Sequence, residues 1–344
     1  MTPGESHYCA SIPARLAGAA FWPIGAAYGL AMHCRRTAYR NGWLRSEGTA
    51  APVICVGNLT VGGTGKTPMV AWLVGQLQSA GRRPAILTRG YKAVAGQSDE
   101  AALLAKLTAV PVIANADRLS AARQAQADGA DVLVMDDGFQ HLRLRRDFNI
   151  VLFDATNPFG GGFWPGAPLP AGRMRESLRA LADAHAVVLT RSDLIPPERL
   201  ADLWSRLAER APKALLATAE HKPTAVIDPA GRSRPVDILA GRKVFLFCGL
   251  GNPEGFLRTA ELLRADVVGV RRLGDHAHYT PKILRGLLAE AKRLGANLLL
   301  TTQKDGVKLP TEPTDPPIHQ LAVEMDLTDG RAELLDAIQG VLHK

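Results

Sequence analysis

The stretch VICVGNLTVGGTGKTP, residues 53–68, decides the fold of this chain. It runs from an apolar, strand-like segment through a glycine-rich turn into Gly65-Lys66-Thr67, where a helical pattern begins. That order is the context of a phosphate-binding loop, in which backbone N–H groups converge on phosphate oxygens at the positive end of a helix. Thr60 stands where the usual motif has its first glycine, and Gly62 and Gly63 lie inside the loop instead. Because the flanking strand and helix patterns are present, the stretch still predicts a nucleotide site.

The motif also assigns roles to its residues. The lysine of such a loop reaches the β- and γ-phosphates and the following hydroxyl binds Mg²⁺, so these roles fall to Lys66 and Thr67. ATP is favoured over GTP, because the segment TRSD at 190–193 lacks the Asn and Lys by which GTPases read guanine. The predicted nucleotide-binding residues are Thr60, Gly62, Gly63, Thr64, Gly65, Lys66 and Thr67.

Apolar runs alternate with helical patterns along the rest of the chain. Strand-like runs occupy 53–59, 84–90, 111–116, 131–138, 148–155 and 186–193. This alternation predicts an α/β fold of the P-loop NTPase type, a parallel sheet with helices on both faces. Further strand-like runs at 266–273 and 297–305, a strand, glycine turn and helix start within 243–256, and a helical pattern at 281–295 predict a smaller C-terminal α/β unit. We therefore expect a membrane-associated segment at 1–48, a P-loop core at 49–222 and a C-terminal domain at 223–344.

Composition narrows the class of protein. Hydrophobic residues make up 47% of the 344 residues and charged residues 22%, as in a globular protein with a real core. The net charge of +8 favours an anionic partner, but nucleic acid, a nucleotide, a phosphorylated substrate or an anionic membrane would all satisfy it. The four cysteines form no CxxC pair, which argues against a disulfide framework or a zinc site.

The segment Leu16–Cys34 carries no Lys, Arg, Asp or Glu. It is marginal as a membrane-spanning helix, because it is rich in Gly and Ala and contains Pro23. An interfacial helix fits better, with its aromatic and aliphatic side chains in the membrane surface and the flanking arginines facing anionic headgroups. Those arginines are Arg15, Arg35, Arg36 and Arg40. The alternative is a helix buried against the main domain.

Acidic residues and a histidine mark further candidate sites. Asp136 and Asp137 follow an apolar strand-like run, where one carboxylate could orient Mg²⁺ or its water. Asp99 and Glu100 begin a helical pattern, where negative charge also suits the helix dipole. His276 lies in GDHAHY, residues 274–279, where an Asp beside a His can tune a proton acceptor. The segment 157–177, rich in Gly and Pro, is expected to be irregular and to contact an anionic, partly apolar ligand.

Taken together, the motifs resemble the tetraacyldisaccharide 4'-kinase family, the lipid A 4'-kinases. The resemblance covers nearly the whole chain, and GNLTVGGTGKTP (57–68) and DDGFQH (136–141) are its most specific parts. In this family a Ser or Thr commonly stands where Thr60 replaces the first glycine. The other matching motifs are the apolar N-terminal segment, LTRGY (87–91), SDEA (98–101), NADRL (115–119), PAGRMRE (170–176), GDHAHY (274–279) and TTQKD (301–305).

The resemblance implies transfer of the ATP γ-phosphate to the 4'-hydroxyl of tetraacyldisaccharide 1-phosphate, which forms lipid IVA. It implies ATP and Mg²⁺ as cofactors and a monotopic protein at the cytoplasmic face of a bacterial inner membrane. Neither nucleic acid nor an obligate protein partner is expected. By motif match, Asp99 and His276 are the expected base pair for the hydroxyl, and Lys66 is the third catalytic residue.

The remaining site residues also come from the resemblance. The residues expected around Mg²⁺ and the phosphates are Thr67, Glu100, Asp136, Asp137 and Gln140, and those expected to bind the substrate are Asn58 and Arg175. The segment between Tyr91 and Asp99 is shorter than is usual in the family, and Ser98 replaces a glycine. Two alternatives stay open: a soluble P-loop kinase for a small metabolite with residues 16–34 in its core, and a membrane-associated ATPase or GTPase switch.

Overall fold

The computed structural model describes residues 21–90, 99–161, 164–274, 277–310 and 312–343. Contacts divide the chain into two compact units. Unit 1 comprises 1–90, 110–220 and 327–344, and unit 2 comprises 91–109 and 221–326. The domains expected from the sequence are continuous segments of the chain. In the structure, by contrast, the segment 91–109 belongs to unit 2 and the segment 327–344 belongs to unit 1. The domain division at 48 and 222 stays a prediction.

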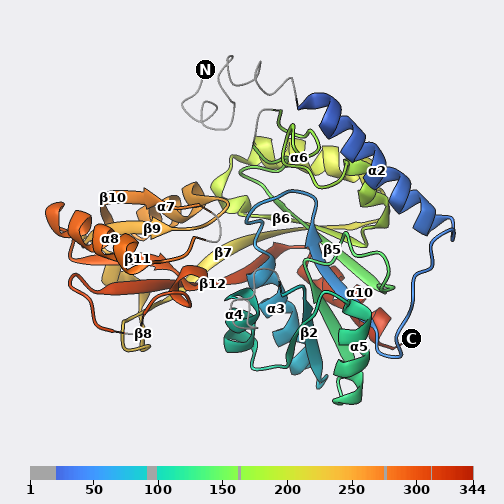
Figure 1. The fold of residues 1–344 in the computed structure, drawn as a ribbon, viewed down its shortest axis with the longest axis horizontal. Coiled ribbons are helices and arrows are strands. Elements are labelled where there is room, and N and C mark those ends of the chain that lie inside the picture. Colours follow the sequence, from blue (N-terminus) through green and yellow to red (C-terminus); the bar gives the residue numbers. More distant parts are fainter. Residues whose placement is uncertain (1–20, 91–98, 162–163, 275–276, 311, 344) are drawn as a thin grey trace. The chain divides into compact units, whose positions relative to one another are not determined.

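Unit 1 is built on a parallel sheet. Its strands lie in the order β7-β6-β5-β1-β4-β2-β3, and all of these neighbours pair in parallel (Figure 1). The strands are β1 (Val53–Asn58), β2 (Pro84–Thr88), β3 (Val112–Ala114), β4 (Val132–Asp136), β5 (Phe148–Asp154), β6 (Ala186–Thr190) and the first part of β7 (Leu215–Ile227). The helices are α2 (Trp22–Arg40), α3 (Lys66–Ser79), α5 (Arg118–Ala127), α6 (Pro197–Arg210), α10 (Arg331–Leu342) and the short η1 (Leu178–Asp183) and η2 (Ser192–Leu194).

The central strands are buried along their whole length, as the apolar runs predict. Every residue of β1, β2, β4, β5 and β6 is buried, which requires cover on both faces of the sheet. Val53 and Cys55 pack in one core cluster with Leu119 of α5 and Leu203 of α6. Alternation sends their neighbours, such as Ile54, to the opposite face, and α3 contacts β1, β2 and β4. The prediction of a parallel sheet with helices on both faces is confirmed.

Unit 2 has its own parallel sheet in the order β10-β9-β11-β12. Its core gathers Val244, Leu246, Leu298, Leu300 and Phe256. The strands are β8 (Ser233–Arg234), β9 (Lys243–Cys248), β10 (Asp266–Arg272), β11 (Leu298–Thr302) and the first part of β12 (Ile318–Asp329). The helices are α4 (Asp99–Thr108), α7 (Pro253–Leu262), α8 (Pro281–Arg293), α9 (Gln303–Gly306) and the short η3 (Val236–Leu239).

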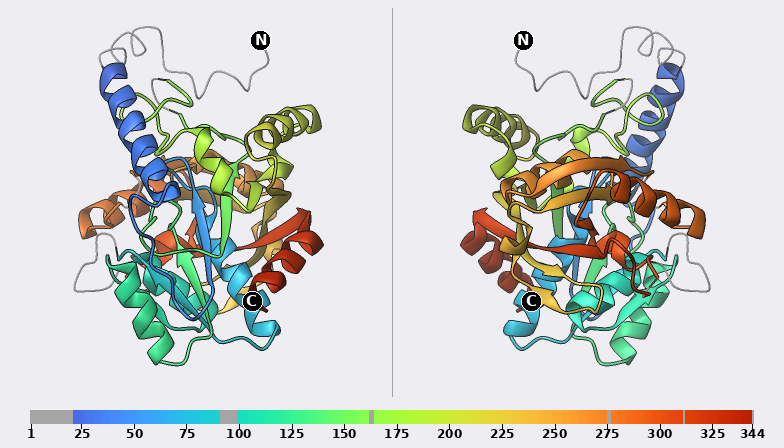
Figure 2. Two further views of the ribbon diagram at one scale, coloured as in Figure 1. Left: turned by 90° about the vertical axis from the view of Figure 1, so that its right-hand side faces the viewer. Right: turned by 90° about the vertical axis from the view of Figure 1, so that its left-hand side faces the viewer.

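Helix α2 is the part of the N-terminal segment that the structure describes. Pro23 sits in its first turn, where a missing N–H costs nothing, so this proline starts the helix. Gly25 and Gly29 face the 157–177 segment: a Cβ on Gly29 would lie 2.8 Å from Pro168 Cγ, and one on Gly25 would lie 3.0 Å from Ala171 Cβ. Figure 2 shows α2, in blue, beside this green segment.

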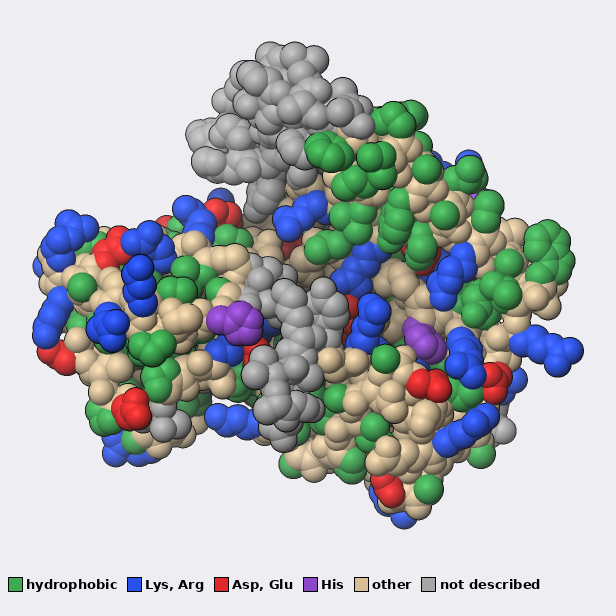
Figure 3. All heavy atoms as spheres, viewed as in Figure 1, with side chains coloured by type: hydrophobic (Ala, Val, Ile, Leu, Met, Phe, Trp, Pro, Cys, Tyr) green, Lys and Arg blue, Asp and Glu red, His purple; other side chains and the backbone are tan. Residues whose placement is uncertain are grey.

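The opposite side of α2 is exposed rather than buried in a core. Ile24 is 57% exposed and Leu30 is 64% exposed. Figure 3 shows hydrophobic side chains gathered over α2. The small-metabolite alternative required this segment to be buried in the core. Residues 21–34 are instead exposed on one side. Within the parts of the chain that the structure describes, every helix falls short of the length and hydropathy that membrane crossing requires.

Candidate active site

The phosphate loop joins β1 to α3. Gly62 has φ +144° and Gly65 has φ +87°, conformations that a side chain would disfavour. Gly65 is the residue that precedes the first turn of α3, and Lys66 and Thr67 follow it directly. The helix therefore begins at the residues to which the motif assigns the phosphates and Mg²⁺.

Side chains hold the loop from inside the unit. Asn58 Nδ2 donates to the Thr64 hydroxyl at 2.9 Å, and the Thr190 hydroxyl donates to the Thr64 carbonyl at 3.0 Å. Thr60 and Thr64 are both buried. The side chains of these threonines thus belong to the framework of the loop.

Arg191 is a second support that the sequence reasoning missed. Its Nη1 donates to the Gly63 carbonyl at 3.0 Å and pairs with Asp154 at the end of β5. Arg191 is a non-glycine residue with positive φ, which marks a conformation held by its surroundings. The signal in the sequence was TRSD at the end of β6, which we interpreted only as a weak likeness to a guanine-reading element.

The irregular segment 157–177 pairs with the start of the phosphate loop. The Val61 N–H donates to the Arg173 carbonyl at 2.8 Å, and the Arg175 N–H donates to the Leu59 carbonyl at 2.7 Å. Thr60 lies opposite Met174 in an antiparallel bridge. This pairing places Arg175 beside the phosphate loop.

Three charged groups meet where β4 ends. Asp137, another non-glycine residue with positive φ, lies 2.8 Å from Arg175 Nη1 and 3.6 Å from Lys66 Nζ. Burial alone would raise the pKa of Asp137, but the charges of Lys66 and Arg175 outweigh it and hold that pKa below its usual range. Asp137 is therefore an ionised carboxylate beside the loop lysine.

Gln140 and Asn58 complete this cluster. Gln140 Nε2 donates to the Asn58 carbonyl at 2.9 Å, and its Oε1 lies 3.5 Å from Arg175 Nη1. The structure thus brings together Asn58, Lys66, Asp137, Gln140 and Arg175 in unit 1, and the buried Asp136 precedes Asp137 at the end of β4.

The oxygen donors of unit 1 suit Mg²⁺. The Thr67 hydroxyl and the Asp136 and Asp137 carboxylates are the hard ligands that Mg²⁺ prefers, and it commonly takes its remaining ligands from phosphates and water. Over the described ranges, no group of three or more His, Cys, Asp or Glu is arranged to hold a metal ion without such help. The residues fit an ion that arrives with a nucleotide.

Asp99 and Glu100 lie at the start of α4, in unit 2. Lys304 Nζ is 2.9 Å from Glu100, and Lys308 Nζ is 3.9 Å from Asp99 and 3.7 Å from the buried Asp305. Sequence reasoning gave neither lysine a role, although Lys304 lies in the matching motif TTQKD (301–305) and Lys308 follows Lys304 by four residues. His276, the expected partner of Asp99, lies outside the described residues.

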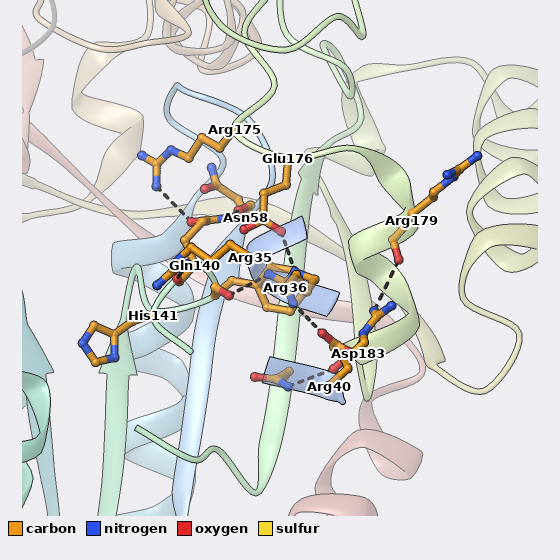
Figure 4. A network of polar contacts seen from close by, with 12 residues as sticks. Arg35, Arg36, Arg40, Asn58, Gln140, His141, Arg175, Glu176, Arg179 and Asp183 are labelled. Carbon is orange, nitrogen blue, oxygen red and sulfur yellow. Dashed lines mark hydrogen bonds and ion pairs between the residues drawn. The ribbon is translucent and has the colours of Figure 1, made fainter. Parts of the chain in front are cut away.

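The arginines at the end of α2 correct one expectation. Arg36 does not face headgroups, because it is 3% exposed and pairs at 2.6 Å with both Glu176 and Asp183 (Figure 4). Arg40 also pairs with Asp183, at 2.7 Å. Arg35 donates to the Gln140 carbonyl at 3.0 Å. Arg36 is thus an internal side chain of unit 1, Arg40 is exposed although it pairs, and Arg15 lies outside the described residues.

Comparisons with known proteins agree along nearly the whole chain. The family model described as LpxK, Tetraacyldisaccharide-1-P 4'-kinase, matches residues 17–342. The Tetraacyldisaccharide 4'-kinase of Anaeromyxobacter sp. (strain K) is 41% identical over 314 residues, which cover 86% of this chain and 82% of that protein. The one from Halorhodospira halophila (strain DSM 244 / SL1) is 35% identical over 347 residues, covering 97% and 94%. A crystal structure of LpxK from Aquifex aeolicus in complex with ATP has a TM-score of 0.72 and 27% identity, covering 95% of this chain and 99% of that one.

Proposed function

The chain belongs to the tetraacyldisaccharide-1-phosphate 4'-kinase family, and on that premise we propose that it transfers the γ-phosphate of ATP to the 4'-hydroxyl of tetraacyldisaccharide 1-phosphate. The product would be lipid IVA, a precursor of lipid A. The observation that carries the proposal is the cluster of Lys66, Asp137 and Arg175 at the mouth of a phosphate loop. The ATP-bound LpxK from Aquifex aeolicus supports ATP as the phosphate donor.

Unit 1 supplies the phosphate chemistry in this proposal. The loop N–H groups and Lys66 bind the β- and γ-phosphates, and Arg175 stabilises the negative charge that spreads over the transferred group. Bound Mg²⁺ would neutralise further charge on these phosphates. Thr67, Asp136, Asp137, Gln140 and Glu100 are the residues proposed to hold the ion, its water or the phosphates.

Asp99 is the proposed proton acceptor. The 4'-oxygen forms a bond to the γ-phosphorus while the bond from that phosphorus to the β–γ bridging oxygen breaks, leaving ADP. The hydroxyl proton passes to the Asp99 carboxylate, with His276 as its proposed partner. The Asp99 carboxylate lies 3.9 Å from the ammonium group of Lys308, so a positive charge partly balances it.

Helix α2 is proposed to bring the kinase to its substrate at the membrane surface. A lipid with several acyl chains leaves a bilayer only at a cost of about 0.8 kcal/mol per CH₂ group. Phe21, Trp22, Ile24 and Leu30 expose apolar surface on or beside this helix, as interfacial helices do. We place the protein on the cytoplasmic face of the inner membrane, where ATP is present.

The test is transfer of label from γ-³²P-ATP to the purified disaccharide in detergent micelles. We expect label in the extracted lipid, loss of transfer in Lys66→Ala, and unchanged transfer in the matched control Lys282→Ala on the exposed side of α8. Label that appears only as free phosphate would instead indicate an ATPase switch. If a small water-soluble sugar is added to the same reaction, label on that sugar but not on the lipid would indicate a metabolite kinase.

A further inference from the structure

Arg36 is a buried cation in a helix whose other side is exposed. Its guanidinium makes three hydrogen bonds: Nε to Glu176 at 2.6 Å, Nη1 to Asp183 at 2.6 Å and Nη2 to the Phe139 carbonyl at 3.0 Å. It also lies over the Phe139 ring, 4.5 Å from the centroid. Figure 4 shows Arg36 between Glu176 and Asp183. Only the planar fork of an arginine satisfies three acceptors in this way.

Glu176 depends on this contact. It is 3% exposed, and its second oxygen, Oε1, makes no hydrogen bond within the described parts of the chain. A buried carboxylate that loses its cation becomes an uncompensated charge, which the surrounding structure must move to relieve. The backbone that carries Glu176 is therefore held in place by α2.

Two of the acceptors of Arg36, Glu176 and the Phe139 carbonyl, are next in sequence to candidate site residues. Glu176 follows Arg175, whose Nη1 lies 2.8 Å from Asp137. Phe139 lies directly before Gln140, and the adjacent Arg35 donates to the Gln140 carbonyl at 3.0 Å. The guanidinium of Arg36 thus joins the segment that carries Arg175 to the segment that carries Asp137 and Gln140.

We propose that Arg36 is a positioning residue for phosphoryl transfer. It sets the places of Arg175 and Gln140 from helix α2, so the helix that offers apolar side chains to the membrane also completes the kinase site. This inference rests on the proposed function and deepens it, because it gives α2 a part in turnover that is separate from membrane binding.

The test compares Arg36→Lys with a matched control, Arg199→Lys, on the exposed side of α6. Lysine keeps the charge but has one point-like ammonium, so it cannot hold Glu176, Asp183 and the Phe139 carbonyl together. We expect kcat at saturating ATP and lipid to fall by about 10- to 100-fold, the cost of a small displacement of catalytic groups. The KM for ATP and binding to phospholipid vesicles should stay within about twofold. The control should match the wild type.

Hydrogen exchange supplies a readout that does not need turnover. The amides of residues 138–141 and 174–177 should exchange faster in Arg36→Lys, while those of β1 keep their protection. Should Arg36→Lys fail to fold, Arg35→Met, which removes the hydrogen bond to the Gln140 carbonyl and the contact with the Tyr39 ring, should still lower kcat by about threefold or more, and a wild-type kcat in it would count against the inference. A folded Arg36→Lys with wild-type kcat, or one that loses vesicle binding instead of kcat, would overturn the inference.

The two proposals fail in different ways. If the wild-type protein labels no lipid, the proposed function is wrong, and the exchange measurement still decides whether Arg36 holds residues 138–141 and 174–177. If the wild-type protein labels lipid and the folded Arg36→Lys labels it at the same rate, only the positioning role is wrong.

Discussion

Asp99 is the residue on which the proposed chemistry depends most. It is the first residue of α4, and Lys308 lies 3.9 Å away. A carboxylate that accepts a proton in the transition state contributes to kcat rather than to nucleotide binding. For Lys66 and Thr67 we expect the reverse, because their proposed contacts with ATP form already in the ground state and so contribute to nucleotide binding.

We therefore predict that Asp99→Asn lowers kcat by about 100-fold or more, the range expected for loss of a general base. The dissociation constant for ATP, measured by calorimetry, should change by less than about twofold, because a base contributes to the transition state and not to ground-state binding. Asp336→Asn, an exposed acid on α10, is the matched control. A wild-type kcat in Asp99→Asn would show that another group accepts the proton.

His141 predicts how stability responds to pH. Burial, with the charges of Arg118 and Arg146, lowers the pKa of His141 from 6.5 to about 4. The unfolded chain therefore takes up a proton near pH 6.5 that the native state accepts only near pH 4. The unfolding free energy should thus fall as pH drops through this window, by roughly 2 kcal/mol after solvent screening is allowed for.

The variant His141→Gln should remove that fall. Urea unfolding at intervals between pH 7 and pH 4 would give a flatter profile than that of the wild type, while His343→Gln, at an exposed position, keeps the wild-type slope. Identical slopes in His141→Gln and the wild type would mean that other groups set the pH dependence.

Sequence patterns pointed to candidate residues within local motifs and missed side chains that pair with partners far away in the sequence. Lys66 and Thr67 follow from the loop motif, and Asp137 from its place after an apolar run. Arg36 pairs with Glu176 across 140 residues and Arg191 with Asp154 across 37, and no spacing rule connects such partners. An arginine at the end of an apolar segment fits headgroups and a buried pair equally well, which is why the expectation for Arg36 was wrong.

One face of helix α2 packs against the rest of unit 1 and the other is exposed. Gly25, Gly29 and Arg36 recur at helical spacing and contact the rest of unit 1, and Ile24 and Leu30 lie on the exposed side. Because Arg35, Arg36 and Arg40 make polar contacts within unit 1, we expect the proposed membrane attraction to come mainly from the apolar side chains. Binding should therefore depend more on buried apolar area than on anionic lipid.

We predict that replacing Ile24 and Leu30 together by Ser weakens binding to phospholipid vesicles by about tenfold or more, because each side chain loses more than 1 kcal/mol of apolar transfer. Sedimentation with vesicles measures it. The double variant should keep its kcat in detergent micelles, and Leu262→Ser, an equally exposed leucine on α7, should bind vesicles normally. Unchanged sedimentation of the double variant would contradict the membrane role of α2.

Lys308, two residues beyond the end of α9, lies beside the first residue of α4. The side chain of Lys308 is 6% exposed and lies between Asp305, which accepts the Gly249 N–H at 2.9 Å, and Asp99. Replacing it by Met removes the charge beside Asp99 but keeps the stem. We expect kcat to fall by about tenfold with unchanged ATP affinity, as for a misplaced base. Lys282→Met is the control, and a Lys308→Met enzyme with wild-type kcat would show that Asp99 needs no such partner.

Some strands end earlier in the structure than the sequence patterns predict. The strand expected at 297–305 ends at Thr302, because the Thr302 hydroxyl accepts the Asp305 N–H and starts α9. The strand expected through 138 ends at Asp136, where Asp137 takes positive φ. The long strand β7 lies in a region, 212–240, for which only unspecified connecting strands were expected, and β12 was not predicted, since the mixed exposed and buried residues of both strands show no continuous apolar run.

At the scale of the whole molecule, the fold type was predictable and the exchange of segments between the units was not. Alternating apolar runs and the loop motif predicted the parallel sheets, and similarity to one family extends over residues 17–342. The C-terminal helix α10 nevertheless belongs to unit 1, where Arg82 donates to the Leu342 carbonyl across 260 residues. Contacts at such separations are absent from any local pattern.

The position of the transferred phosphate tests the whole proposal most directly. Lipid from a reaction with ATP and tetraacyldisaccharide 1-phosphate would be purified and analysed by ³¹P–¹H correlation NMR. We predict one new phosphate monoester coupled to the proton at the 4' carbon, with the 1-phosphate unchanged. A diphosphate at the 1 position, a phosphate on another hydroxyl, or free phosphate without modified lipid would contradict the assignment of this chain's activity.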